Sequence, residues 1–491
     1  MSESSIALNR LGYGLRRGEQ VPDNPRRYLL DQMEAFDPAP AAIAGREDTS
    51  GKAGEILEML RRNRRQRQMQ MAGGDADAAM SEPGDMRRMG QRQQGADPFA
   101  GLPPEVRQSY QSAAQVLRSD IGLRTNVAIN SPAPMMERLV HFWANHFSVS
   151  AQKPGTHYQV AAHEFRAIRP HVLGKFSDML KAAALHPAML LYLDQFQSVG
   201  PNSQFQQRRR RAQAGGRQQR GLNENLAREI LELHSLGVDG GYSQGDVTEL
   251  ARALTGWTIQ GLARVERFAE PQETGAAFVR FAHEPGERQV LGRRYRDTGA
   301  GQALSILDDL ASHPSTARFI ATKLARHFAG DTPPASLVTA LEADFQRSGG
   351  DLASLTRTLI EASETWREGP VKFRQPFEWL VSALRLTGVN NLSARRISGA
   401  LSEIGQMPWR APSPAGYDDL EGSWAGPDAL FRRVELAERI ARGAPSDNIL
   451  SRAEAAFPGA LTASTRTALS RAESGPQALG LLLVSPEMMR R

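Results

Sequence analysis

Apolar residues recur at helical spacing along most of the chain, and this periodicity restricts the possible folds more than any other feature of the sequence. In 136–147 the apolar side chains stand four, three and four residues apart, so they share one face of a helix. These residues are Met136, Val140, Trp143 and Phe147. The same spacing returns in 161–172 and, through Leu222, Leu226, Ile230 and Leu233, in 222–233. We therefore predict a predominantly helical, all-α fold.

Local signals refine this prediction. Ser243 stands three residues before Asp246, the pattern of a capping box at the start of a helix. Pro314 follows His313 ahead of another apolar stripe, and proline is favoured in the first turn of a helix. Strand-like alternation with glycine is found only around 277–295, which predicts a minor short β-hairpin.

Two stretches interrupt the periodic sequence. Residues 64–98 are rich in Gln, Gly, Met, Arg and Asp, and residues 204–220 are rich in Arg and Gln. Both are poor in large aliphatic side chains, a composition that buries too little surface to offset the entropy lost on ordering. We expect both to be disordered surface inserts. The remaining chain predicts one large helical body over 1–440 and a C-terminal helical extension over 441–491 that packs on the same body.

The distribution of charge argues against several classes of partner. The net charge is +6, but 204–220 alone carries six arginines and no acid, so the rest of the chain is balanced. This distribution argues against nucleic-acid binding. No apolar run is long enough to cross a membrane, and the first residues lack the pattern of a secretory signal, which predicts a cytoplasmic protein, or a periplasmic one if the true start differs. The absence of cysteine excludes disulfides and thiolate sites.

The first concentration of polar chemistry lies in 221–242. On a helical projection Asn225, Arg228, Glu229 and Glu232 flank the apolar stripe rather than oppose it, so partial burial is expected. Half-buried carboxylates require pairing or hydrogen bonds, which Arg228 can supply from one helical turn away. One interpretation is an acid/base pair, Glu229 and Glu232, with Asn225 and Arg228 positioning a substrate. The alternative is a structural salt-bridge network.

The second concentration lies in 137–169, which holds four of the ten histidines of the chain. His141 and His146 are candidates for assisting catalysis, and His163 and Arg166, three residues apart on one face, are candidates for binding substrate. The spacing of five between His141 and His146 is poor for zinc, so no metal ligands are assigned. Lys323 and His327 also share a face, which we expect to lie toward solvent rather than toward an anionic group.

Several of these segments carry a family resemblance. The runs HFWANHFSV (141–149), HPAMLLYLD (186–194) and NENLAREILELHSLGVDGGYSQGDVTELARALTGWT (223–258) resemble the bacterial domain-of-unknown-function 1800 family. KLARHF (323–328) and KFRQPFEWLVSALRLTG (372–388) fit the same family, and the likeness spans nearly the whole chain apart from the two inserts. The resemblance implies no established activity and no catalytic residues. It implies possible neighbours, because members are often encoded beside sulfatase-like proteins.

Three functional hypotheses follow. The first is a hydrolase or lyase that uses the His, Glu and Arg residues above, between helices, on a polar or anionic substrate. The second is a non-catalytic binding or assembly partner of a sulfatase-like protein, and the third is a divalent-metal-binding protein using oxygen and nitrogen ligands. The sequence identifies no cofactor, and the oligomeric state is not predicted.

The substitution Glu232→Gln separates a structural carboxylate from a catalytic one, because it removes charge while keeping shape. If Glu232 belongs to a buried ion pair, we expect its loss to reduce the free energy of unfolding by about 3 kcal/mol or more, since the partner charge is stranded. A catalytic carboxylate tolerates the change or gains stability. Urea unfolding of the purified variant measures the difference, and an unchanged stability would contradict the ion-pair interpretation.

Overall fold

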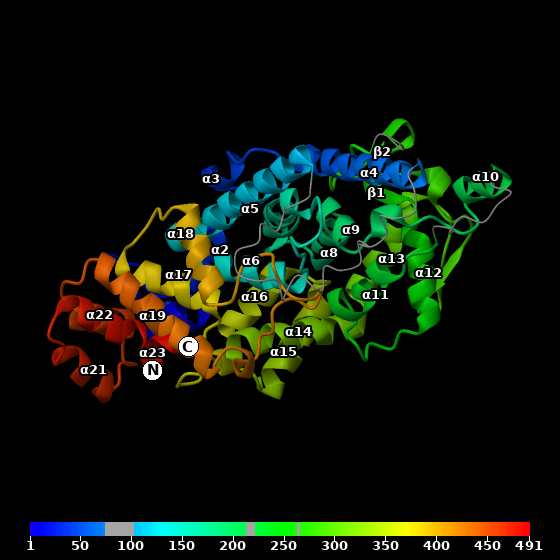
Figure 1. Ribbon diagram of the computed structural model, residues 1–491. Coiled ribbons are helices and arrows are strands. Elements are labelled where there is room, and N and C mark those ends of the chain that lie inside the picture. Colours follow the sequence, from blue (N-terminus) through cyan, green and yellow to red (C-terminus); the bar gives the residue numbers. More distant parts are fainter. Residues whose placement is uncertain (74–102, 213–220, 263–265) are drawn as a thin grey trace.

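The computed structural model describes residues 1–73, 103–212, 221–262 and 266–491. Helices dominate these ranges, and both termini lie at the same end of the body, beside α23 (Figure 1). The predicted all-α class is therefore confirmed.

The α-helices are α1 (Glu3–Ser5), α2 (Pro25–Ala35), α3 (Ala41–Ala44), α4 (Ser50–Gly73), α5 (Pro104–Asn130), α6 (Pro134–His146), α7 (Val160–Ala162), α8 (Phe176–Ala184), α9 (Pro187–Tyr192), α10 (Gln204–Ala212), α11 (Asn225–Glu229), α12 (Gln244–Leu254), α13 (Ala300–Ser312), α14 (Pro314–Ala329), α15 (Ala335–Ser348), α16 (Leu352–Glu361), α17 (Pro376–Thr387), α18 (Ala394–Glu403), α19 (Pro427–Gly443), α20 (Ile449–Ala456), α21 (Ala463–Ser470), α22 (Gly475–Leu483) and α23 (Pro486–Met489). π-Helical turns occur at η1 (Ile6–Leu11), η4 (His163–Ile168) and η7 (Ile230–His234). Short 3-10 turns are η3 (Thr156–Tyr158), η5 (Arg169–His171), η6 (Gln195–Gln197), η8 (Glu266–Phe268), η9 (Arg280–Ala282), η10 (Ser363–Trp366) and η11 (Glu421–Ser423).

The helix starts predicted from capping patterns are found in the structure. Ser243 and Asp246 form both hydrogen bonds of the capping box at the start of α12. α14 begins at Pro314, and the imidazole Nδ1 of His313 accepts a hydrogen bond from the backbone N–H of Ser315. The apolar face predicted for 136–147 is buried along its whole length.

The stripe predicted for 222–233 is correct only in its middle. Leu226 and Ile230 are buried, whereas Leu233 is only half-buried. The cause is η7, in which the chain winds more widely than an α-helix, so that a period of 3.6 residues loses phase after residue 230. Leu231 and His234 are buried instead.

Strands are short and gather in one region. β4 (Arg288–Val290) and β5 (Arg293–Tyr295) form an antiparallel hairpin inside the predicted 277–295 range. A second sheet, in the order β1-β3-β2, joins β1 (Trp257–Ile259), β3 (Ala276–Phe278) and β2 (Glu270–Pro271). This sheet was not predicted, because its strands are two or three residues long and carry no readable alternation.

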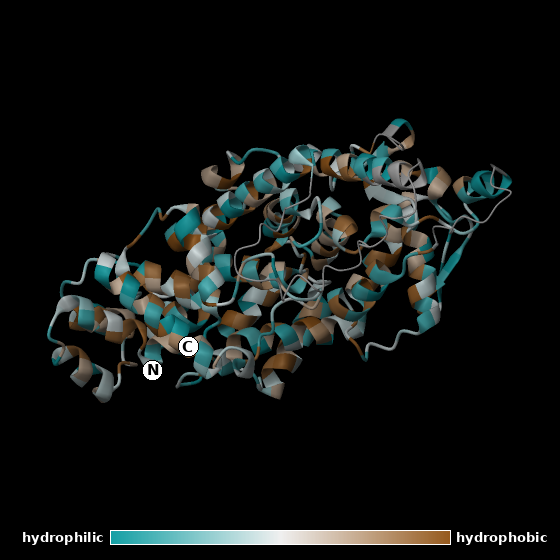
Figure 2. Cartoon of the chain, in the orientation of Figure 1, coloured by the Kyte–Doolittle hydropathy of each residue, from teal (hydrophilic) through white to brown (hydrophobic). Residues whose placement is uncertain are grey.

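Only part of each predicted insert lies in the described ranges, and that part is helical. Residues 64–73 continue α4, and residues 204–212 form α10, which lies at the far end from the termini and is mainly hydrophilic (Figures 1 and 2). Gln and Arg recur in both segments and are strong helix formers, which favours helices there. The remainder of both predicted inserts, 74–98 and 213–220, lies outside the described residues.

One continuous apolar core runs through the body, from Ile6 to Met489. Ile449 and Leu479, from the predicted C-terminal extension, belong to this core, and the predicted boundary at residue 440 falls inside α19. The division into 1–440 and 441–491 therefore stays a prediction.

No helix in the described ranges is long and apolar enough to cross a bilayer.

The contact between α5 and α18 generates a test of core packing. A Cβ added to Gly122 would lie 2.8 Å from the Ala394 Cα, so we expect Gly122→Ala to lower the free energy of unfolding by about 1–3 kcal/mol through overpacking. Gly399, on α18, has no atom within 4 Å of such a Cβ. Gly399→Ala should raise stability by about 0.5–1 kcal/mol through helix propensity. Urea unfolding measures both, and equal effects would refute this packing.

Candidate functional site

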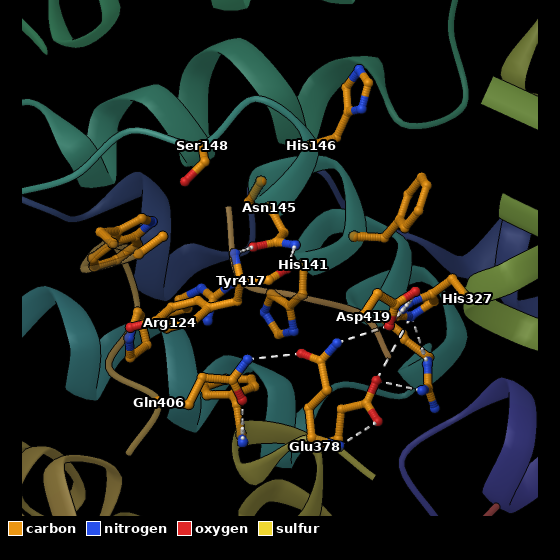
Figure 3. Close-up of a pocket in the computed structure, with 18 of the residues that line it drawn as sticks. Arg124, His141, Asn145, His146, Ser148, His327, Glu378, Gln406, Tyr417 and Asp419 are labelled. Atoms are coloured by element: carbon orange, nitrogen blue, oxygen red, sulfur yellow. Dashed lines mark hydrogen bonds and ion pairs between the residues drawn. The ribbon is translucent and has the colours of Figure 1, made fainter. Parts of the chain in front are cut away.

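A pocket of about 90 Å³ lies where α5, α6, α14, α17 and the segment 404–426 meet (Figure 3). The polar and aromatic side chains that line it come from parts of the chain far apart in sequence. They are Tyr13, Arg124, Arg138, His141, Phe142, Asn145, His146, Ser148, Lys323, His327, Gln375, Phe377, Glu378, Gln406, Trp409, Tyr417 and Asp419.

His141 lies on α6, and both of its ring nitrogens have defined surroundings. The Tyr13 hydroxyl lies 2.6 Å from Nδ1, and Nε2 lies 4.0 Å from a carboxylate oxygen of Glu164. No other acceptor for the Tyr13 hydroxyl is found among the described residues, so this hydroxyl donates to Nδ1 and the ring proton is on Nε2. Burial and then the charge of Arg124 hold the pKa of His141 well below its ordinary value. His141 is therefore a neutral imidazole that offers an N–H to the pocket.

His146 lies beside Lys323, a half-buried cation that also lines the pocket. Its Nε2 lies 3.2 Å from the backbone carbonyl of His234 and must donate to it, which leaves Nδ1 to accept a hydrogen bond from Lys323 Nζ at 3.1 Å. No carboxylate lies within 4.0 Å of Lys323 Nζ in the described part of the chain. Burial lowers the pKa of Lys323 to about 8. Lys323 is thus able to exchange a proton near neutral pH.

His327, one turn further along α14, is held by an acid. Its Nδ1 lies 3.2 Å from both carboxylate oxygens of Asp419, and its Nε2 accepts from Arg138 Nε at 3.3 Å. Burial lowers the pKa of His327 to about 4, so the ring is neutral and donates from Nδ1. The expectation that Lys323 and His327 lie toward solvent is wrong. His327 is buried and Lys323 is half-buried, because α6, α17 and 404–426 supply side chains that contact the face that a single helix would expose.

Glu378 is the central carboxylate of the pocket floor. Arg138 Nη2 donates to it at 2.5 Å, and Arg491 donates to it through Nε at 3.1 Å and Nη2 at 3.2 Å. Burial alone raises the pKa of Glu378, but the two guanidinium groups outweigh burial and bring it to about 2. The carboxylate is therefore ionised at any physiological pH, and it holds together three separate segments of the chain.

The segment 404–426 covers the pocket and is tied down by Asn145. The Asn145 side chain donates to the Tyr417 carbonyl at 2.8 Å and accepts from the Tyr417 N–H at 2.7 Å (Figure 3). Gly416 has φ +84°, and a Cβ there would lie 2.4 Å from the Asn145 carbonyl oxygen, so only glycine fits. Trp409 adopts φ +56°, which is strained for a side chain of this size, and its indole N–H donates to Glu164 at 2.8 Å.

The residues predicted in 221–242 do not line this pocket. Asn225 is exposed, and Arg228 lies 3.8 Å from Glu224 and donates to Gln244, not to Glu232. Glu229 and Glu232 are half-buried close together, and burial and then Glu232 raise the pKa of Glu229.

Glu232 is instead hydrogen-bonded to the Tyr242 hydroxyl. Its removal strands no buried cation, so the structure lowers the expected cost of Glu232→Gln to less than about 1 kcal/mol.

Two of the four residues predicted in 137–169 lie at the pocket, and the other two lie elsewhere. His141 and His146 line the pocket, whereas His163 and Arg166 do not. His163 is a buried core histidine that donates from Nε2 to the Ala183 carbonyl at 3.2 Å. Arg166 is at the surface and pairs with Asp48 at 2.9 Å.

Sequence reasoning missed most of the pocket. Arg124, Glu378 and Asp419 lie in segments where nothing marks them as different from surface charges. Two signals were available in the sequence: the shared face of Lys323 and His327, and the proline- and glycine-rich turns near residue 410. Among the described residues, no group of three or more His, Asp or Glu side chains is placed to hold a metal ion.

Comparison with known proteins matches the chain to one family, whose description states no activity. The model of a family described as "Protein of unknown function (DUF1800)" matches residues 6–490. No curated protein and no solved structure matches the chain.

The buried Glu378 generates a test by acid unfolding. Its depressed pKa means that it contributes stability above the unfolded pKa of about 4.3, and that this stability is lost as pH falls toward about 2. Glu378→Gln should cost about 3–5 kcal/mol at neutral pH, because Arg138 and Arg491 lose their partner, and should flatten the stability curve below pH 4.5. Urea unfolding across this range measures both effects. Glu438→Gln, at an exposed position, is the control, and identical acid slopes in wild type and Glu378→Gln would contradict the burial described here.

Proposed function

Because the chain belongs to the DUF1800 family, whose description states no activity, we propose its function from the pocket: an acid/base enzyme, a hydrolase or lyase, acting on a polar or anionic substrate. The observation that carries the proposal is Lys323, a cation with no carboxylate within 4.0 Å among the described residues, whose pKa burial lowers to about 8. Groups tuned in this way by burial are typical of catalytic acids and bases.

Lys323 is the proton-transfer group in this mechanism. In its neutral form it removes a proton from the substrate or from a water molecule. His146 positions the amine, because its only free nitrogen accepts from Nζ while the other is engaged by the His234 carbonyl. This assigns His146 to positioning rather than to contact with the substrate.

His141 supplies the second element of the mechanism. Its Nε2–H faces the pocket and is held in one tautomer by the Tyr13 hydroxyl. A neutral imidazole N–H stabilises negative charge that develops on a substrate oxygen when a proton is removed. Asp419 and Arg138 hold His327 from opposite sides, which keeps this wall of the pocket rigid.

The other residues predicted from the sequence have no part in this proposal. Glu229, Glu232, Asn225, Arg228, His163 and Arg166 lie outside the pocket. The non-catalytic partner of a sulfatase-like protein and the divalent-metal-binding protein remain predictions, and no observation on the described residues favours either.

Activity is tested with a panel of chromogenic esters, phosphates, sulfates and glycosides, and by the ultraviolet absorbance of unsaturated elimination products. We expect kcat/KM to rise with pH through about 8, as Lys323 loses its proton. Lys323→Met and Lys323→Arg should each lower the rate by about 100-fold or more, because neither side chain can act as the base. Lys181→Met, outside the pocket, is the matched control.

A second measurement does not depend on finding the substrate. The rate of reductive methylation of Lys323, followed by mass spectrometry against pH, reports its pKa directly. A midpoint near 8 supports the proposal. A midpoint near the ordinary lysine value of about 10.4, or full activity in Lys323→Met, would reject it.

A further inference from the structure

Arg124, on α5, uses only part of its hydrogen-bonding capacity. Its Nε donates to both carboxylate oxygens of Glu164, at 2.7 and 2.9 Å. Its terminal nitrogens, Nη1 and Nη2, donate to no group among the described residues, although the side chain is only 9% exposed. Arg124 lines the pocket, so the unused end of the guanidinium is available there.

Two aromatic rings hold the plane of this guanidinium. The Phe377 ring centroid lies 4.6 Å from the Arg124 Cζ, and the Trp409 ring centroid lies 5.6 Å from it. Trp409 is itself fixed, because its indole N–H donates to the same Glu164 that accepts from Arg124. Little conformational freedom is left for Arg124 to lose when a ligand binds.

A comparison with Arg169 shows that the free end is a property of this site. Arg169 also pairs with a buried carboxylate, that of Glu137, through Nη1 at 2.7 Å and Nη2 at 2.6 Å. Its Nε and Nη2 also donate to the backbone carbonyls of Pro38 and Asp37. All three nitrogens of Arg169 are therefore used, as expected for a purely structural arginine.

We propose that Nη1 and Nη2 of Arg124 bind two oxygens of an anionic group of the substrate, a carboxylate, sulfate or phosphate. The guanidinium fork matches the spacing of two oxygens on each of these groups. A pocket of about 90 Å³ admits one such group. Lys323, a second cation of the pocket, has no carboxylate within 4.0 Å among the described residues and adds attraction for negative charge. The inference rests on the pocket of the proposed function and names its substrate class.

Equilibrium binding tests this inference without turnover. Sodium acetate, sulfate and phosphate are titrated separately into the protein in chloride buffer, by calorimetry, at up to about 50 mM. We expect at least one of them to bind with a stoichiometry of one, and the identity of the tightest to separate the three sources. Arg124→Lys keeps the charge that Glu164 requires but lacks the fork, and should weaken binding at least about tenfold.

Arg169→Lys is the matched control, because it alters a buried arginine–glutamate pair outside this pocket and should leave the affinity unchanged. Equal affinities in wild type and Arg124→Lys, or no binding of any of the three anions, would overturn the inference. If Arg124→Lys does not fold, the fluorescence of Trp409 in the wild type decides. It is assigned by its loss in Trp409→Phe, and a saturable change with the anion supports the inference, whereas no change refutes it. If the wild type binds the anion while Lys323→Met keeps full activity, only the proposed role of Lys323 as the base is rejected.

Discussion

The buried ion cluster around Glu378 is the interaction on which the site depends. A single carboxylate on α17 accepts from Arg138 on α6 and from Arg491, which follows α23. A buried charge is stable only when it is paired and hydrogen-bonded, so these segments cannot separate without exposing or stranding a charge. The cluster thereby sets the distance between α6 and α17, and with it the width of the pocket above.

Burial, with a smaller contribution from positive charge, lowers the pKa values of the two histidines beside this cluster. Burial, reinforced by Arg124 for His141 and by Arg138 for His327, keeps both imidazoles neutral. Each ring then has one donor and one acceptor nitrogen. Tyr13 selects the tautomer of His141, and Asp419 selects the tautomer of His327. Fixed tautomers are what an acid/base site requires, because a donor in the wrong place cannot stabilise the reacting oxygen.

Strain in the covering segment is consistent with a functional role for the pocket. Trp409 is held in the left-handed region, and Gly416 occupies a position that no larger residue fits. The conformation of Trp409 places its indole against Arg124 and Glu164. Glycine at 416 allows the Asn145 side chain to hydrogen-bond to the backbone of Tyr417. Such costs are retained when the surrounding structure determines the conformation.

The sequence by itself determined the helical class, the starts of α12 and α14, the hairpin at 288–295, and the two histidines of α6 that reach the pocket. These features are local, since apolar period, capping and proline act within one or two turns. The apolar stripe predicted for 222–233 is wrong after residue 230, because a period of 3.6 residues does not anticipate a π-helical turn. Only the tertiary structure decided that Lys323 and His327 are covered, that Arg124 keeps a free end, and that Glu229 and Glu232 lie elsewhere. The physical reason is that the pairing and burial of a charge depend on which distant segments pack beside it.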